Sequence, residues 1–263
     1  MQVYIDAVGI MGPGLTGWKD NVDKLRNSTH YEFIEMQDQN TSLLPANERR
    51  RTTHNIKLAL AAAEDAVSQN KTDRKQLATV FASSEGDTEI VDKICTSLTY
   101  PGRPVSPTHF HNSVHNAPAG YWAIATGSRM TSTSLSAHHA SFSAGLVEAM
   151  VMIANDPAPV LLVAYDYPPP DPLLAVCPMN TPFSVALLLN REASDHCIAK
   201  CKVEITPGDN YSRIDNDQLE SIRLGNPAAR SLPLLIMLAE KNNGSVFLPY
   251  LPGSLLNIEI EQC

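Results

Sequence analysis

The sequence predicts an α/β fold built around a large buried core. Strand-like apolar runs alternate with helix-like ones along the chain, which is typical of α/β proteins. Residues 159–165 (PVLLVAY) are apolar almost without a break, as expected for a strand that is covered on both faces of a sheet. The 263 residues are 43% hydrophobic and 18% charged, which suffices for one large core or two closely packed halves.

Local patterns predict the first strands and helices. Residues 2–11 are rich in Val and Ile and lead into a Gly-Pro-Gly turn, as a strand would. Residues 56–67 (IKLALAAAEDAV) are Ala-rich and predict a helix, and residues 78–82 predict a short strand. Residues 117–126 predict an apolar helix that ends at Gly127.

The middle of the chain continues the alternation. Residues 131–137 alternate small and β-branched side chains, which predicts a buried strand. Apolar residues at helical spacing from Phe142 to Ile153 predict a helix that ends at an Asn-Asp-Pro sequence. After the strand at 159–165, the Pro-rich loop 167–172 (YPPPDP) is interpreted as a connector, because polyproline docking needs an exposed and flexible segment.

The last part of the chain predicts further strands and one helix. Residues 184–189 and 197–205 predict strands, residues 228–241 a helix, and residues 245–261 two strands joined by a Pro-Gly turn. No internal repeat is evident in the sequence.

Charge and composition argue against several classes of function. The formal net charge is −8, and the only basic cluster, Arg49-Arg50-Arg51, fits a solvated turn before a helix, so we do not expect nucleic-acid binding. No apolar run reaches transmembrane length and the first residues lack a basic region, so we expect no membrane association and a cytoplasmic location. We also expect no cofactor.

The five cysteines predict neither a disulfide framework nor a metal site. Their number is odd and they are scattered, which is not the pattern of a disulfide-rich domain. Cys197 and Cys201 are three residues apart but lack companion ligands for zinc. We therefore expect ordinary reduced thiols at Cys95, Cys177, Cys197, Cys201 and Cys263.

Four segments follow one another in an order seen in a known family. They are an opening strand with a glycine turn (3–14), an Arg-rich turn with an Ala-rich helix (50–67), an Asn-initiated helix (116–127, NAPAGYWAIATG) and a stretch leading into a core strand (155–164). In order and spacing they resemble the β-ketoacyl synthases of the thiolase-like superfamily. This resemblance implies a thiolase-like αβαβα layered fold.

The resemblance is uneven along the chain. It covers residues 1–192, which would form a complete first half of the fold. Residues 193–263 would form an abridged remnant of the second half, packed as one domain with the first. The family's Glu-Ala-His-Gly-Thr-Gly-Thr segment has no counterpart in the short stretch 205–223.

The segment 136–149 (SAHHASFSAGLVEA) resembles the family's nucleophile turn, where a Cys lies between a strand and a helix. Aligning the Ala-Ser and Glu-Ala pairs of this segment places His139 where that Cys would stand, with His138 beside it. The family's Cys accepts the acyl chain as a thiolate, whereas imidazole does not normally sustain a stable acyl intermediate. The resemblance also places Leu224 near the second catalytic His, so it implies the loss of nucleophile and histidines alike.

Other chemistry at the remaining polar residues is less favoured. Five histidines lie near one landmark, namely His109, His111, His115, His138 and His139, and histidine is the usual general base near neutral pH. Residues 109–116 contain no Asp or Glu, no His-Glu-x-x-His pattern occurs, and Ser141 and Ser143 lack a Gly-x-Ser-x-Gly elbow. We interpret the histidines as hydrogen-bonded fillers of a vestigial pocket and an interface, and expect no metal.

The resemblance extends to chain-length factors, cysteine-less ketosynthase relatives that pair with an active ketosynthase and limit the length of its product. It implies heterodimerisation with a full-length β-ketoacyl synthase, and short versions of this kind are similar to those of aryl polyene clusters. Acyl carrier protein is acidic like this chain, so we expect only indirect contact with it. The residues expected at the interface and acyl tunnel are Phe110, His111, Asn112, Val114, His115, Asn116, Thr131, Ser132, Thr133, Ser134, Leu135 and Ser136.

The sequence leaves two alternatives open. One is a stand-alone malonyl-carrier decarboxylase or acyltransferase that uses His138 and His139, although relatives of that kind keep the downstream histidines. The other is a homodimeric scaffold that binds acyl carriers. In each dimeric case we expect the edge at residues 131–137 to be paired, because a free strand edge promotes aggregation.

Overall fold

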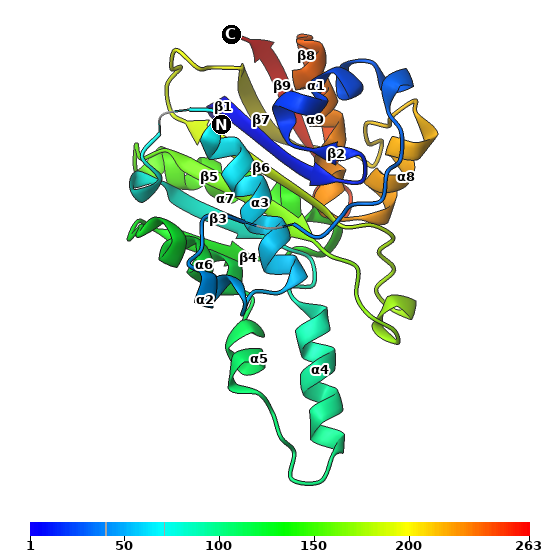
Figure 1. Cartoon of the computed structure of the whole chain (residues 1–263). Helices are drawn as coiled ribbons and strands as arrows, with labels where there is room; N and C mark the ends of the chain where they lie inside the picture. Colours follow the sequence, from blue (N-terminus) through cyan, green and yellow to red (C-terminus); the bar gives the residue numbers. More distant parts are fainter. Residues whose placement is uncertain (40, 71) are drawn as a thin grey trace.

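The computed structural model describes residues 1–39, 41–70 and 72–263, and these form one mixed sheet with helices on both faces (Figure 1). The order of the main strands is β4-β3-β5-β6-β1-β7-β9-β8, and the short β2 (Leu15–Thr16) pairs with β1. The α/β prediction is therefore confirmed.

The first half of the fold supplies five neighbouring strands, β4 (Ser132–Leu135), β3 (Ala78–Ala82), β5 (Val160–Asp166), β6 (Phe183–Asn190) and β1 (Gln2–Gly12). β3 runs parallel to β4 and β5, whereas β6 is antiparallel to both β5 and β1. Every residue of β3 and β5 is buried, as expected for strands with helices on both faces.

Helices cover the two faces of the first half. α3 (His54–Ser68) and α6 (Ala117–Thr126) lie on one face, and α7 (Ser141–Asn155) lies on the other. α3 comes very close to β1 because Gly9 faces it: a Cβ at that position would lie 2.0 Å from the carbonyl oxygen of Ala62. Only glycine fits that approach.

The second half repeats part of this arrangement. α9 (Leu232–Glu240) precedes the antiparallel pair β8 (Gly244–Pro249) and β9 (Ser254–Gln262), as α7 precedes β5 and β6. β7 (Ala199–Pro207) pairs antiparallel with β9 and with β1, so the order β7-β9-β8 repeats β1-β6-β5. Beyond β8 the described residues have no counterpart of β3 and β4.

The second half is abridged in the sense that it repeats only part of the strand order of the first half. The described residues contain the inner strands of both halves but not the outer two strands of the second half. The repeat is not evident in the sequence because the repeated elements share only burial and order. The loop between β6 and β7 contains the predicted boundary between residues 192 and 193.

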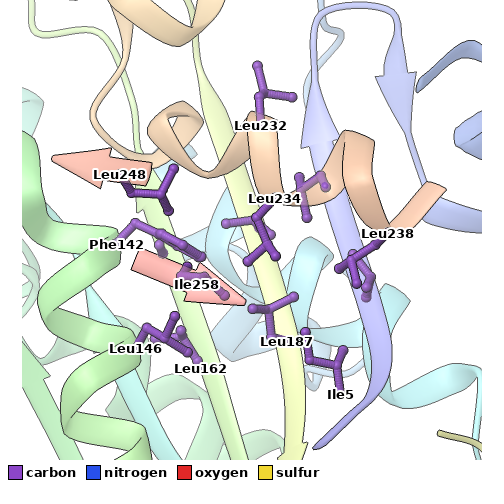
Figure 2. Packing of buried hydrophobic residues seen from close by; sticks show 14 of the residues in the cluster. Ile5, Phe142, Leu146, Leu162, Leu187, Leu232, Leu234, Leu238, Leu248 and Ile258 are labelled. Carbon is purple, nitrogen blue, oxygen red and sulfur yellow. The ribbon is translucent and has the colours of Figure 1, made fainter. Parts of the chain in front are cut away.

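One apolar layer lies between the helices and strands of both halves (Figure 2). Phe142 and Leu146 of α7 pack in the same cluster as Leu234 and Leu238 of α9, above Leu187 of β6. All five side chains are at most 2% exposed. Removing any one of them would leave a cavity at this junction, which costs about 2–5 kcal/mol for a large apolar side chain.

Several helices of the structure were not predicted from the sequence patterns. The ones not predicted include α1 (Trp18–Arg26), α4 (Thr88–Thr99) and α8 (Asp217–Gly225). α4 and α5 (Pro107–Asn112) project away from the body of the molecule (Figure 1). α4 buries only Ile90, so it lacks the apolar stripe by which a helix is recognised. The remaining short helices are η1 (Ser28–His30), α2 (Ala46–Arg49), η2 (Arg74–Gln76), η3 (His138–Ala140), η4 (Leu173–Ala175) and η5 (Ala228–Ser231).

Two predictions made from the sequence are wrong. The strand predicted as buried at residues 131–137 is the short edge strand β4, whose residues are exposed or half-exposed, because its outer side has no neighbouring strand in the described chain. Cys197 and Cys263 are not free thiols: they form a disulfide, with Cα atoms 5.8 Å apart. The pairing of β7 with β9 brings the two cysteines together across 66 residues of sequence, which no spacing rule detects.

Cys95, Cys177 and Cys201 are free. Among the helices that the structure describes, none combines the length and the apolar character needed to cross a membrane.

Candidate functional site

The turn between β4 and α7 holds the position predicted for the nucleophile. His138 has a left-handed backbone (φ 50°), and its ring stacks on that of His139 with 4.0 Å between centroids. The hydroxyl of Ser141 donates to the carbonyl oxygen of His138 (2.7 Å) and accepts from the amide of Ala137 (3.0 Å). Ser141 therefore stabilises the turn and has no free hydroxyl for catalysis.

The two histidines are surface groups beside one carboxylate. Nδ1 of His138 lies 3.7 Å from Oε1 of Glu85, which also accepts a hydrogen bond from the hydroxyl of Ser84 (3.1 Å). Burial, together with the neighbouring charges of His138 and Arg230, lowers the pKa of His139. A neutral imidazole at this position is a weaker nucleophile than a thiolate and leaves no stable acyl adduct.

A cysteine that the sequence patterns did not single out approaches the same carboxylate. Cys177 lies in the loop after β5, and burial and the Glu85 carboxylate raise the pKa of its thiol. A reactive cysteine needs the opposite environment, with cationic neighbours that favour the thiolate. The geometry therefore gives Cys177 no activation. Its closeness to Glu85 depends on the path of the Pro-rich loop, which carries no sequence signal for it.

A buried polar network supports the floor of the site. Oδ1 of Asp166 accepts hydrogen bonds from the hydroxyl of Ser83 (2.9 Å) and the amide of Ser84 (2.7 Å). Burial raises the pKa of Asp166 to about 7. The side chain of Asn226 donates to the carbonyl oxygens of Asp166 (3.0 Å) and Thr181 (2.7 Å). This network fixes the end of β5 to the start of the second-half helices.

The position matched to the second catalytic histidine has no imidazole. Leu224 is 53% exposed in the last turn of α8, and its carbonyl oxygen accepts a hydrogen bond from Nη2 of Arg230 (3.2 Å). No histidine follows His196 in the sequence.

Of the residues predicted for the interface and tunnel, some are exposed at the surface and others contact residues of this chain. Phe110 is 69% exposed and Val114 is 50% exposed, which leaves both free for contact with another molecule. His111 is exposed as well, and its ring packs edge-on against Tyr121. Nε2 of His115 lies 3.1 Å from the carbonyl oxygen of Ser83.

Asn112 has a different role from the one expected. It is buried, donates to the carbonyl oxygen of Arg51 (2.7 Å) and accepts from the hydroxyl of Tyr121 (3.1 Å). It holds α5 on the body of the molecule and is not presented at the surface. The sequence pattern carries no information on which polar residue of this segment points inward.

The outer side of β4 presents unpaired backbone groups. The carbonyl oxygens of Thr131 and Leu135 accept hydrogen bonds from Thr79 and Ser83 on the β3 side (3.0 and 3.1 Å). Because alternate residues of a strand point their backbone groups to opposite sides, Ser132 and Ser134 direct theirs away from β3. In the described part of the chain nothing pairs with them.

The other end of the sheet is covered. The amide of Ser212 donates to the carbonyl oxygen of Phe247 in β8 (2.9 Å), and the amide of Phe247 donates to the hydroxyl of Ser212 (2.9 Å). This contact blocks the middle of the β8 edge. The two edges of the sheet are thus unequal, and the β4 edge is the open one.

A hollow of about 530 Å³ lies between α6 and β4. It is lined by His115, Asn116, Ala119, Gly120, Ala123, Ser132 and Ser134. Gly120 lies within α6, where glycine costs about 1 kcal/mol relative to alanine. Outside the backbone of α6 itself and the two neighbouring residues, a Cβ at Gly120 would meet no atom of the described residues within 4 Å, so no contact there requires glycine.

Over residues 1–39, 41–70 and 72–263, no three side chains from His, Cys, Asp and Glu gather as a metal site would require. His109, His111 and His115 thus do not converge.

The chain matches the model of a known protein family over most of its length. The family model described as β-ketoacyl synthase, N-terminal domain, matches residues 23–243. The chain belongs to the β-ketoacyl synthase N-terminal domain family. The resemblance drawn from the sequence is confirmed, and so is the thiolase-like fold.

Solved structures with this fold differ in how much of their length the β-ketoacyl synthase-like chain covers. The ketosynthase ApeO in complex with its chain length factor ApeC, from Xenorhabdus doucetiae, matches with a TM-score of 0.76 and 22% identity over 98% of this chain and 99% of that chain. The ishigamide ketosynthase/chain length factor matches with a TM-score of 0.78 and 13% identity over 99% of both chains. Comparison with curated proteins gives no match.

By contrast, ketosynthase twelve of the bacillaene polyketide synthase from Bacillus amyloliquefaciens matches with a TM-score of 0.58 and 12% identity. The match spans 85% of this chain but only 49% of that ketosynthase. These identities establish a shared fold.

Proposed function

We propose that this chain is a non-catalytic, chain-length-factor-like subunit that pairs with an active β-ketoacyl synthase and shapes its acyl tunnel. The observation that carries the proposal is the turn between β4 and α7, next to the open β4 edge, where the resemblance places His139 at the position of the family's cysteine. A subunit without a nucleophile needs a partner that has one, and the open edge is a place to bind it.

The absence of an activated thiol supports a silent role. Cys177, the thiol beside Glu85, has a raised pKa, and the pKa of His139 is lowered. The resemblance places Leu224 near the position of the family's second catalytic histidine. Together these features leave neither an acyl acceptor nor the histidines that would polarise a malonyl group.

The unequal edges of the sheet support the β4 side as the interface. Ser132 and Ser134 offer outward backbone groups that a second strand can pair with, whereas Ser212 covers the middle of β8. The hollow beside β4 and the helix glycine Gly120 extend the same surface. A strand added at this edge would continue the sheet into the partner.

The tunnel wall is the finer part of the proposal. Phe110 and Val114 are exposed on the projecting α4–α5 region, where bulky side chains could close the end of a tunnel in the partner. A wall of this kind limits an acyl chain because a further unit would overlap it, and overpacking costs about 1–3 kcal/mol or more. Polyene, polyketide and fatty-acid-type chains are all substrates of this class, and an aryl polyene pathway is the one we propose.

The structures that match over their full length support the same assignment. Two of them are described as complexes or pairs of a ketosynthase with a chain length factor. The net charge of −8 argues that the partner, not this chain, binds the acidic acyl carrier protein.

The test is co-expression with the ketosynthase encoded nearest to this chain, followed by size-exclusion chromatography and a malonyl-dependent elongation assay. We expect a 1:1 complex that elongates, and elongation that stays within about twofold in His138→Ala and His139→Ala, since neither imidazole takes part in acyl transfer. As a matched positive control, the partner's nucleophilic cysteine is replaced by alanine, which should abolish elongation.

A different outcome would favour an enzyme. A chain that decarboxylates malonyl carrier alone, and loses this activity in His139→Ala, would overturn the proposal in favour of a decarboxylase or acyltransferase. A stable homodimer that ignores the ketosynthase and binds acyl carriers would favour the scaffold alternative.

A further inference from the structure

We infer that the Cys197–Cys263 disulfide is a redox-sensitive clasp on the second half of the fold. It joins the segment just before β7 to the residue just after β9 and closes a loop with a sequence separation of 66 residues. All the strands and helices of the abridged half lie within that loop.

The abridged half has a physical need for such a clasp. Its strands β7, β9 and β8 end at an edge where the first half continues with two further strands. Fewer strands bury less apolar surface per residue, and a cross-link compensates by restricting the unfolded chain. The clasp therefore stabilises the part of the molecule that has lost the most packing.

The two cysteines stay aligned without the covalent bond. The amide of Cys263 donates to the carbonyl oxygen of Ile198 (3.2 Å), and the amide of Cys197 donates to the carbonyl oxygen of Ser194 (3.1 Å). The hydroxyl of Ser194 is itself bound to the carboxylate of Asp6 (2.6 Å). The backbones of both cysteines are thus held by hydrogen bonds that do not involve the sulfurs, so the bond can break and re-form without refolding.

Exposure suits the clasp to exchange with soluble thiols. Cys263 is exposed and Cys197 is half-buried, so a reductant can reach the bond. The nearby Cys201 is buried in β7, where burial raises the pKa of its thiol to about 12. Cys201 is therefore not a competing nucleophile, and exchange should not scramble the pairing.

The chemistry is a two-electron exchange with a soluble dithiol. One thiolate of the dithiol attacks one sulfur of the disulfide and forms a mixed disulfide, releasing the other cysteine as a thiolate that takes up a proton. The second thiolate of the dithiol then displaces the remaining cysteine. The clasp ends as two thiols, and the dithiol ends as a cyclic disulfide.

The first measurement is the number of thiols that react with a maleimide probe in urea, before and after reduction with dithiothreitol. We expect three labelled cysteines in protein purified without reductant and five after reduction, with a cross-linked peptide containing Cys197 and Cys263 in a non-reducing digest. Five labelled cysteines before reduction, in protein handled in air, would overturn the inference.

The second measurement is the urea midpoint of the isolated chain. Dithiothreitol should lower the midpoint of the natural chain by roughly 1–2 M, as expected for a loop of this length. The double variant Cys197→Ser/Cys263→Ser should have the lower midpoint with or without dithiothreitol, and Cys95→Ser, at an exposed free cysteine, should behave like the natural chain. An equal effect of dithiothreitol on the double variant would contradict the clasp. Because this test needs no partner, its failure is separate from failure of the proposed ketosynthase pairing.

Discussion

The identity of some residues in this chain is explained by their contacts within the molecule, and the identity of others is not. Asp166 is explained from within, because its carboxylate ties β5 to the serines after β3. Gly120 is not, because a Cβ there would meet no other element of the described chain within 4 Å. A residue with no internal reason for its identity points to an external one, here the proposed partner at the hollow beside β4.

Gly120→Ala should therefore separate folding from binding. We expect the isolated chain to become more stable by roughly 0.5–1 kcal/mol, because alanine is the better helix former and fits without a clash. We expect affinity for the ketosynthase to fall by about tenfold, because the added methyl group would hold the partner off α6. Urea unfolding and titration calorimetry measure the two effects.

The matched control for Gly120→Ala is Ser221→Thr, which adds one methyl group at an exposed position of α8. It should change neither quantity appreciably. An unchanged affinity in Gly120→Ala, in a protein that does bind the ketosynthase, would show that the partner does not approach α6.

Asp166 makes stability depend on pH. Its pKa in the folded chain is about 7, above the value of about 3.9 for an unfolded aspartate, so the folded state binds the proton more tightly. The resulting stability is complete below about pH 4 and is lost as pH rises towards 7. We expect the free energy of unfolding to decrease over this range by an amount on the order of 2–4 kcal/mol from this group alone.

Asp166→Asn tests that dependence, because an amide oxygen can still accept from Ser83 and Ser84 while the titration is removed. The variant should show a shallower decrease in stability between pH 4.5 and 7.5 in urea unfolding. Some slope should remain, since burial also raises the pKa of Asp6, Asp65 and Asp87. Identical slopes in the two proteins would mean that Asp166 is ionised in the folded state throughout.

Among the elements of the fold, β4 and β8 are the two end strands of one sheet, and their outer edges differ. β8 is covered at Phe247 by Ser212, and β4 is left open. An open edge in a natural protein is usually protected by charge, proline or a neighbour, and β4 has none of these among its own residues. A neighbour from another molecule is the remaining form of protection.

Ser132→Pro should block that neighbour with little effect on the chain itself. The backbone amide of Ser132 points away from β3, so its loss removes no hydrogen bond to β3, and proline is tolerated on an edge strand. We expect the isolated chain to lose less than about 1 kcal/mol of stability and the complex with the ketosynthase to disappear from size-exclusion profiles.

The control for Ser132→Pro is Ser132→Ala, which keeps the amide and removes only the hydroxyl that accepts from Thr79 (2.8 Å). It should retain the complex. If both variants bind equally well, the partner does not pair with β4.

At the scale of the whole molecule, the elements that could be predicted from the sequence are those whose apolar residues are deeply buried. β5 and β6 appear as nearly continuous apolar runs and β1 as a run rich in Val and Ile, because helices cover both faces of the sheet; α3 and α7 appear because each buries a wide apolar face. The division into residues 1–192 and 193–263 stays a prediction, and one shared core lies across it.

What the sequence could not predict depends on contacts between distant segments. From its sequence, β4 resembles a buried strand. In the structure it is exposed because no strand of the described chain lies on its outer side, and local composition carries no information about such a neighbour. α4 projects from the body and buries one residue, so it carries little periodic signal. The disulfide and the position of Cys177 beside Glu85 both arise from the paths of loops and strands that the spacing of cysteines does not record.

The open β4 edge and the covered β8 edge also decide how far this molecule can assemble. A building block with two free sheet ends adds copies at both and can grow into fibres, whereas one with a single free end stops growing when that end is occupied. With the partner that we propose at β4, growth would end at that partner and the assembly would be a pair. The number of such pairs in a cell would then be set by the less abundant of the two subunits. Unpaired copies of the more abundant subunit would keep their sheet edge exposed.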